Sequence, residues 1–103
     1  MAELELVSQV HDGGASVVVR GEVDMATAPQ LRETLLALVD DGASRIALDC
    51  RGLGFLDSSG IGVLIAVRNR LGDQGSLTLE APPAHVRKVL ELTGVSEHVT
   101  IIS

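Results

Sequence analysis

The segment from residue 45 to residue 71 constrains the fold more than any other part of the chain. An apolar run at 45–50 has the length of a buried strand, and a short polar stretch leads from it into an apolar helical run that ends near Leu71. A strand followed by such a helix is typical of a strand–helix–strand unit, whose crossover is right-handed and whose two strands are parallel. The segment therefore predicts an α/β domain.

Flanking patterns supply the other elements of such a domain. Turn and cap signals separate strand-like runs and two further helical runs, and Asp12-Gly13-Gly14 predicts a tight hairpin between the first two strands. The predicted strands are 4–10, 17–24, 45–50, 76–80 and 99–102, and the predicted helices are 27–41, 60–71 and 84–93. The order is β-β-α-β-α-β-α-β. Since the opening hairpin is antiparallel, we expect a mixed sheet.

Two details of these elements are specific predictions. Leu4, Leu6 and Val10 alternate with polar residues, which predicts one buried face on the first strand. Thr27 and Gln30 have the spacing of a capping box at the start of the first helix, where Pro29 is tolerated.

Composition excludes several classes of function. The net charge is −6, with 14 acidic and 8 basic residues, which argues against partners that are nucleic acids or anionic membranes. Phe55 is the only aromatic residue, so stacking of bases or sugars is not expected. The lone cysteine, Cys50, ends an apolar strand and is interpreted as a core residue. With no basic N-terminal region and no long apolar run, we expect a cytoplasmic protein without membrane insertion.

The motif Asp57-Ser58-Ser59-Gly60 precedes the apolar helical run and carries the most chemistry. Unpaired N–H groups and the macrodipole favour an anion at a helix start. Aspartate and serine are preferred N-caps, so the motif is either a cap or a place for a phosphate, and the two are compatible. The residues alone leave both interpretations open.

Catalytic interpretations of this motif fit poorly. The hydrolase elbow Gly-x-Ser-x-Gly is absent, since Leu56 and Asp57 stand where its first glycine belongs. The histidines, His11, His85 and His98, are scattered without triad or metal-ligand spacing. No nucleotide-binding glycine loop occurs either. We therefore expect no enzyme activity, no cofactor and no metal.

The helical run from Ile61 to Val67 is apolar in nearly every direction. One face must enter the core. The remainder is either covered by packing against the sheet or left near the helix start as a docking surface for a partner.

The residues from Asp49 to Leu64, with Phe-Leu-Asp-Ser-Ser-Gly-Ile-Gly at 55–62, resemble the signature of STAS-domain anti-sigma factor antagonists. Gly21-Glu22-Val23-Asp24 is similar to that family's Gly-Glu-Leu-Asp motif, and Leu92-Thr93-Gly94-Val95 to its late Leu-x-Gly-Leu segment. The resemblance covers essentially the whole chain. It implies a single STAS domain over 1–103, with a mixed sheet and helices packed mainly on one face.

The resemblance also implies a function. The unphosphorylated antagonist would bind an anti-sigma factor that is a serine/threonine kinase, freeing a sigma factor, and phosphorylation of Ser58 would end binding until a serine phosphatase resets it. The implied partner-binding residues are Glu22, Asp24, Asp57, Ser59, Gly60 and Ile61. Glu22 and Asp24 would be acidic contacts, and the alternative role for either is formation of the turn after Gly21. A monomer or weak dimer is expected.

The alternative is a constitutive STAS scaffold or transporter-associated subunit that phosphorylation does not regulate. Two departures from the family pattern stand out. Cys50-Arg51 replaces the usual aliphatic or polar pair, and the chain stops at Ser103 where many members continue into another helix. A C-terminal part of the partner surface is therefore expected to be absent if that helix has been trimmed.

Overall fold

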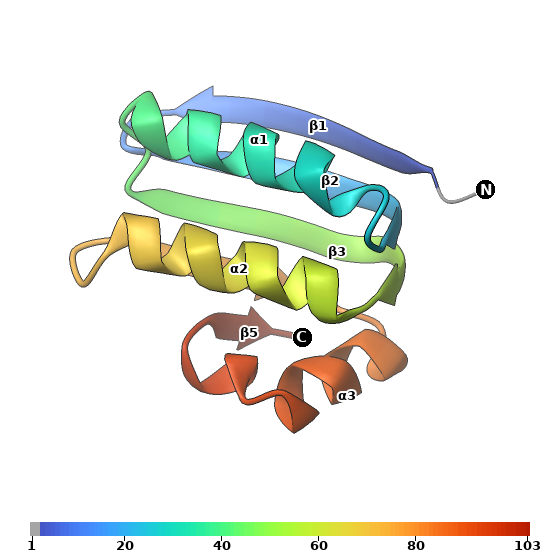
Figure 1. Cartoon of the computed structure of the whole chain (residues 1–103). Helices are drawn as coiled ribbons and strands as arrows, with labels where there is room; N and C mark the ends of the chain where they lie inside the picture. Colours follow the sequence, from blue (N-terminus) through green and yellow to red (C-terminus); the bar gives the residue numbers. More distant parts are fainter. Residues whose placement is uncertain (1–2) are drawn as a thin grey trace.

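The computed structural model describes residues 3–103 and arranges them around one five-stranded mixed sheet (Figure 1). The strands lie in the order β1-β2-β3-β4-β5, with β1 antiparallel to β2 and the other neighbours parallel. This confirms the predicted element order. The elements are β1 (Leu4–His11), β2 (Gly14–Val23), α1 (Ala28–Asp40), β3 (Arg45–Leu56), α2 (Ser58–Leu71), β4 (Ser76–Glu80), α3 (Ala84–Leu92), the 3-10 helix η1 (Val95–Glu97) and β5 (Thr100–Ile102).

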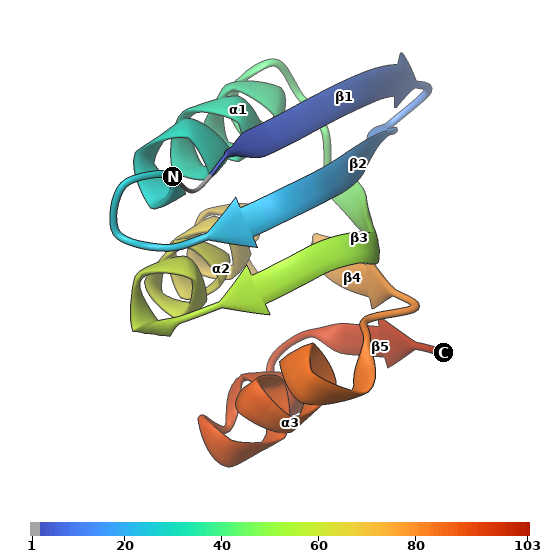
Figure 2. The same cartoon turned by 90° about the vertical axis from the view of Figure 1, so that its right-hand side faces the viewer.

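Helices α1 and α2 lie side by side on one face of the sheet (Figures 1 and 2). Alternate strand residues point into this layer and are almost fully buried, as the period of two along a strand requires. They include Val17, Val19, Ile46, Leu48, Leu77 and Leu79. Leu31 and Leu35 of α1 meet them from the helical side. The helices therefore cover one face, as predicted.

Strand β3 is longer than predicted. The sequence places its end at Cys50, whereas the strand continues to Leu56 and pairs along β2 as far as Val23. Two register irregularities in the β2–β3 pairing, each with one extra residue on β3, accommodate the extension, and Leu53 and Leu56 are buried. Gly52 and Gly54 make this half of the strand resemble a turn in the sequence. At Gly52 the small residue is needed for packing, because a Cβ there would lie 2.9 Å from Cγ of Arg20.

The predicted capping box at the start of α1 is wrong. The Thr27 hydroxyl donates to the Glu22 carbonyl (2.7 Å) instead of accepting from the helix, and no side chain caps α1. The Gln30 side chain reaches across to β1 and donates from Nε2 to the Leu4 carbonyl (3.2 Å). Both groups serve contacts between elements, which local spacing does not reveal.

The buried face of β1 is also shorter than predicted. Leu4 and Leu6 are half-buried and pack against the core, whereas Val10 is 73% exposed.

Helix α3 packs beside the second half of β3. Since β4 pairs only with Arg45–Asp49, the later part of β3 has β2 on one side and α3 as its other neighbour. Val86 and Leu90 are buried there, and Nε2 of His85 lies 2.7 Å from the Gly54 carbonyl oxygen. The end of β3 is thus held on both sides.

Cys50 is a core residue, as predicted, and is 1% exposed. Burial raises the pKa of its thiol to about 12. Because the thiolate is the reactive form, we expect a thiol reagent such as dithionitrobenzoate to leave the folded protein unmodified at pH 8 and to titrate one thiol in denaturant. Since the unfolded thiol ionises first, it also lowers the free energy of unfolding as the pH rises from 9 towards 12. Rapid labelling of the folded chain would contradict this assignment.

Candidate functional site

The candidate site lies where β2 and β3 end together at one edge of the sheet. Val23 and Leu56 are in register, and the Asp57 amide donates to the Val23 carbonyl (3.2 Å). After β3, the chain enters α2 at Ser58. After β2, a tight loop leads to α1, which begins at Ala28. Parallel pairing of two strands thus brings residues 22–27 beside residues 55–58.

Asp57 caps helix α2. It has extended backbone geometry, and its Oδ1 accepts from the amides of Ser59 (2.8 Å) and Gly60 (3.4 Å). These are two of the amides that a helix start leaves without partners, so the carboxylate satisfies them and complements the macrodipole. From the sequence, Asp57, Ser58 or Ser59 could each cap this helix, and in the structure the cap is Asp57.

Ser58 is therefore free of the capping role. It is the first residue of α2 and its side chain is exposed. Within residues 3–103, its hydroxyl makes no hydrogen bond with another protein group. Ser58 therefore presents an exposed hydroxyl at the start of the helix.

Asp24 organises the neighbouring loop. Its Oδ1 accepts from the amides of Ala26 (2.9 Å) and Thr27 (3.1 Å), while the Thr27 hydroxyl accepts from the Asp24 amide (3.0 Å). This closed network fixes the turn between β2 and α1. Glu22, opposite Phe55 in the sheet, is exposed. Both acidic residues lie at the same sheet edge as Ser58, but only Glu22 has a carboxylate free of the turn.

Gly60 and Ile61 lie beneath this edge. Ile61 is 6% exposed and belongs to the core, and a Cβ on Gly60 would collide with Leu56 and lie 2.7 Å from Cγ1 of Val23. Ser59 is half-buried. Of the predicted partner-binding residues, Gly60 and Ile61 thus support the site from below.

The rest of α2 is mostly covered by packing. Val63, Leu64 and Val67 are buried, and Ile65 is an exposed large apolar side chain of the helix, at 42%. The apolar run is therefore explained largely by the core.

Comparison with known proteins identifies the family of this chain. A family model described as "Mlab, STAS domain" matches residues 7–102. The chain is 32% identical over 93 residues to the anti-sigma-B factor antagonist of Bacillus subtilis (strain 168), a match that covers 88% of this chain and 84% of that protein. This chain belongs to the STAS-domain family of anti-sigma factor antagonists. Such antagonists are regulators and not enzymes.

Solved structures of the STAS family agree with the fold. An anti-sigma factor antagonist from Mycobacterium paratuberculosis superposes with a TM-score of 0.88 at 30% identity, over 97% of this chain and 86% of that one. The antagonist SpoIIAA in its unphosphorylated form gives a TM-score of 0.79 at 26% identity, over 100% and 89%. A structure of Bacillus SpoIIAA in the phosphorylated form gives 0.71 at 25% identity, over 100% and 92%.

Two exposed apolar side chains near the STAS motif were not among the predicted site residues. Met25 is 79% exposed in the loop after β2, and Phe55 is 43% exposed next to Glu22. Exposed methionine and aromatic side chains are typical of interface anchors. For Phe55 the sequence did carry a signal, because it is the sole aromatic residue and lies two positions before Asp57. We call Glu22, Met25, Phe55 and Ser58 the Ser58 surface.

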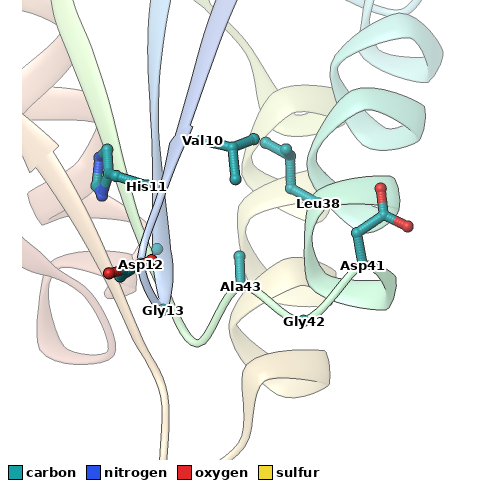
Figure 3. A pocket seen from close by; sticks show the side chains of 9 residues that line it. Val10, His11, Asp12, Gly13, Leu38, Asp41, Gly42 and Ala43 are labelled. Atoms are coloured by element: carbon teal, nitrogen blue, oxygen red, sulfur yellow. The ribbon is translucent and has the colours of Figure 1, made fainter.

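A cavity of about 310 Å³ lies away from the Ser58 surface and opens between the β1–β2 hairpin and the end of α1 (Figure 3). Val10 and Leu38 point toward each other across it, and the carboxylate of Asp41 is turned outward.

Within residues 3–103, no cluster of His, Cys, Asp or Glu could hold a metal ion, and no helix is long and apolar enough to cross a membrane.

The cap assignment predicts a stability difference between neighbouring positions. Asp57→Ala removes both accepted hydrogen bonds and should lower the free energy of unfolding by about 1 kcal/mol, with Asp57→Asn losing less. Ser58→Ala, the matched control, should cost under about 0.5 kcal/mol because its exposed hydroxyl bonds nothing. Urea titration followed by circular dichroism measures both. Equal losses at the two positions would contradict the assignment of the cap to Asp57.

Proposed function

We propose that this chain is an anti-sigma factor antagonist that binds an anti-sigma serine/threonine kinase when Ser58 is unphosphorylated, frees a sigma factor, and is released when Ser58 is phosphorylated. A serine phosphatase resets the switch, and the cycle takes place in the cytoplasm. Residues 1–103 act as one STAS domain. The observation that carries the proposal is the exposed, unbonded hydroxyl of Ser58 beside a separate capping residue.

The division of labour between Asp57 and Ser58 supports a switch that acts on binding and not on folding. Asp57 holds the helix start through hydrogen bonds that do not involve the Ser58 hydroxyl. A phosphoryl group adds about −1.5 to −2 charge directly beside this carboxylate. Because no fold-stabilising contact depends on the Ser58 hydroxyl, the added charge acts chiefly on whatever lies over the Ser58 surface.

The partner would meet a small apolar centre with an acidic border. Met25 and Phe55 are exposed and would bury apolar area when a partner binds. The carboxylates of Glu22 and Asp57 would attract a basic patch on the kinase. Asp24 contributes mainly by holding the loop that presents Met25. Gly60 and Ile61 contribute from the core, and Ser59 flanks the acceptor.

Phosphate mapping tests the proposed acceptor. The chain is incubated with ATP and a cognate anti-sigma kinase, and the modified residue is located by mass spectrometry. We expect one phosphate on Ser58, none on Ser58→Ala, and full modification of the control Ser59→Ala. Unchanged phosphorylation of Ser58→Ala would overturn the acceptor assignment. Phosphorylation of Ser58 with no effect on kinase binding would favour the constitutive scaffold or transporter-associated subunit.

A further inference from the structure

The outer edge of β1 has unused backbone hydrogen-bonding groups. Strand β1 lies at the end of the sheet, and within residues 3–103 no strand lies beyond it (Figures 1 and 2). It pairs with β2 in an unbroken register of eight residues, without a bulge, proline or lysine. Bulges, prolines and lysines are among the devices with which proteins block an edge strand. The one carboxylate of β1, Glu5, lies 3.8 Å from the guanidinium of Arg20 on β2, so the backbone of this edge is open to pairing.

Hydrogen-bond alternation identifies the free groups. The Glu22 amide donates to the Glu3 carbonyl (3.0 Å), so the odd-numbered residues of β1 face β2 and the even-numbered ones face outward. Of the outward residues, Leu4 already accepts from the Gln30 side chain. Leu6, Ser8 and Val10 remain, each with an outward N–H and C=O.

These three residues are self-complementary. In an antiparallel pair centred on Ser8, Ser8 lies opposite its own copy and Leu6 lies opposite Val10 of the second chain. Each such pair exchanges two backbone hydrogen bonds. A pair centred on Leu6 would need the carbonyl of Leu4, which already accepts from the Gln30 side chain. A pair centred on Val10 would leave Leu6 without a strand partner.

Side chains agree with the same register. On the helix-bearing face, the 73% exposed Val10 would pack against Leu6 of the second chain, at the mouth of the cavity that Val10 and Leu38 line (Figure 3). On the open face, Glu5 would lie opposite His11, and both side chains already contact β2, Glu5 at Arg20 (3.8 Å) and His11 at Ser16 (3.1 Å). Val7, 53% exposed, would approach its own copy diagonally.

We propose that two copies of this chain associate through β1, antiparallel and centred on Ser8, to form a continuous ten-stranded sheet. A two-fold axis normal to the sheet relates the copies and places both helical layers on the same face. The two Ser58 surfaces then lie at opposite ends of the dimer and stay accessible. This association is independent of the proposed phosphorylation switch.

Sedimentation equilibrium tests the dimer. Edge-to-edge interfaces are small and weak, so the full chain is measured up to about 1 mM. We expect the apparent mass to rise from 10.8 kDa towards twice that value. Ser8→Pro removes an outward N–H that β2 does not use and should weaken association at least tenfold, whereas the control Ser8→Ala, which keeps the N–H, should associate like the wild type.

Two further measurements keep the test decisive. Val10→Glu, at an exposed position, replaces Ser8→Pro if proline prevents folding, and should also weaken association. In a mixture of isotope-labelled and unlabelled chains, we expect intermolecular nuclear Overhauser effects between Leu6 and Val10. A monomer at the highest concentration, wild-type association of both variants, or intermolecular contacts on another surface would each overturn the proposal.

Discussion

Replacing Ser58 with glutamate is expected to weaken binding to the cognate anti-sigma kinase by at least about 100-fold, which corresponds to ~2.7 kcal/mol. The substitution adds a second carboxylate beside Asp57 at the centre of the Ser58 surface, where a docked partner would have to bury it. Titration calorimetry with the purified kinase measures the change.

The matched control separates charge from size. Ser58→Gln has nearly the shape of Ser58→Glu but no charge, so it should retain clearly more affinity. The thermal midpoint of both variants should stay within a few degrees of the wild type, because Ser58 is exposed and Asp57 keeps the cap. Equal losses of affinity would show that bulk and not charge governs docking.

The two glycines at the start of α2 are expected to respond in opposite directions to alanine. At Gly60 an added methyl group meets Leu56 and the stiff, β-branched Val23, both in the core. Overpacking of about 3 kcal/mol, offset by about 1 kcal/mol of helix propensity, predicts a net loss of about 2 kcal/mol. At Gly62 nothing lies within 4 Å of the added Cβ, so only the gain in propensity, about 0.5–1 kcal/mol, remains.

Thermal unfolding of the two variants checks this pair. A loss of about 2 kcal/mol corresponds to a decrease in the midpoint of roughly 10 °C for a domain of this size, and Gly62→Ala should unfold a few degrees above the wild type. If the two variants unfold at the same temperature, Gly60 is not a packing constraint beneath Ser58. Lower stability of Gly62→Ala would point to a role for that exposed position outside packing.

Most of the fold was predictable because its signals are local. Apolar periodicity and glycine stops gave the right order of elements, and β4 was predicted at its observed bounds of Ser76–Glu80. The second half of β3 was missed because Gly52 and Gly54 weaken its strand signal, and only pairing with β2 reveals it. Thr27 and Gln30 likewise matched a local motif, but the Thr27 hydroxyl bonds to the backbone of β2 and the Gln30 side chain to the backbone of β1.

The candidate site was predictable in position but not in the roles of its residues. The motif at 57–60 pointed to a helix start, yet its residues are chemically similar as caps, and only the geometry shows that Asp57 takes this role. Asp24 was expected either as an acidic contact or as a turn residue, and its Oδ1 accepts from two amides of the turn. Met25 and Phe55 were missed because exposure depends on how two strands end together, which no single segment encodes.

The most direct test of the switch is calorimetric titration of the anti-sigma kinase, in the presence of ADP, with unphosphorylated chain and with chain phosphorylated on Ser58. We predict clear binding of the unphosphorylated chain, at least about 100-fold weaker binding of the phosphorylated chain, and recovery after phosphatase treatment. Equal affinity of the two forms would contradict the proposal that Ser58 controls partner binding.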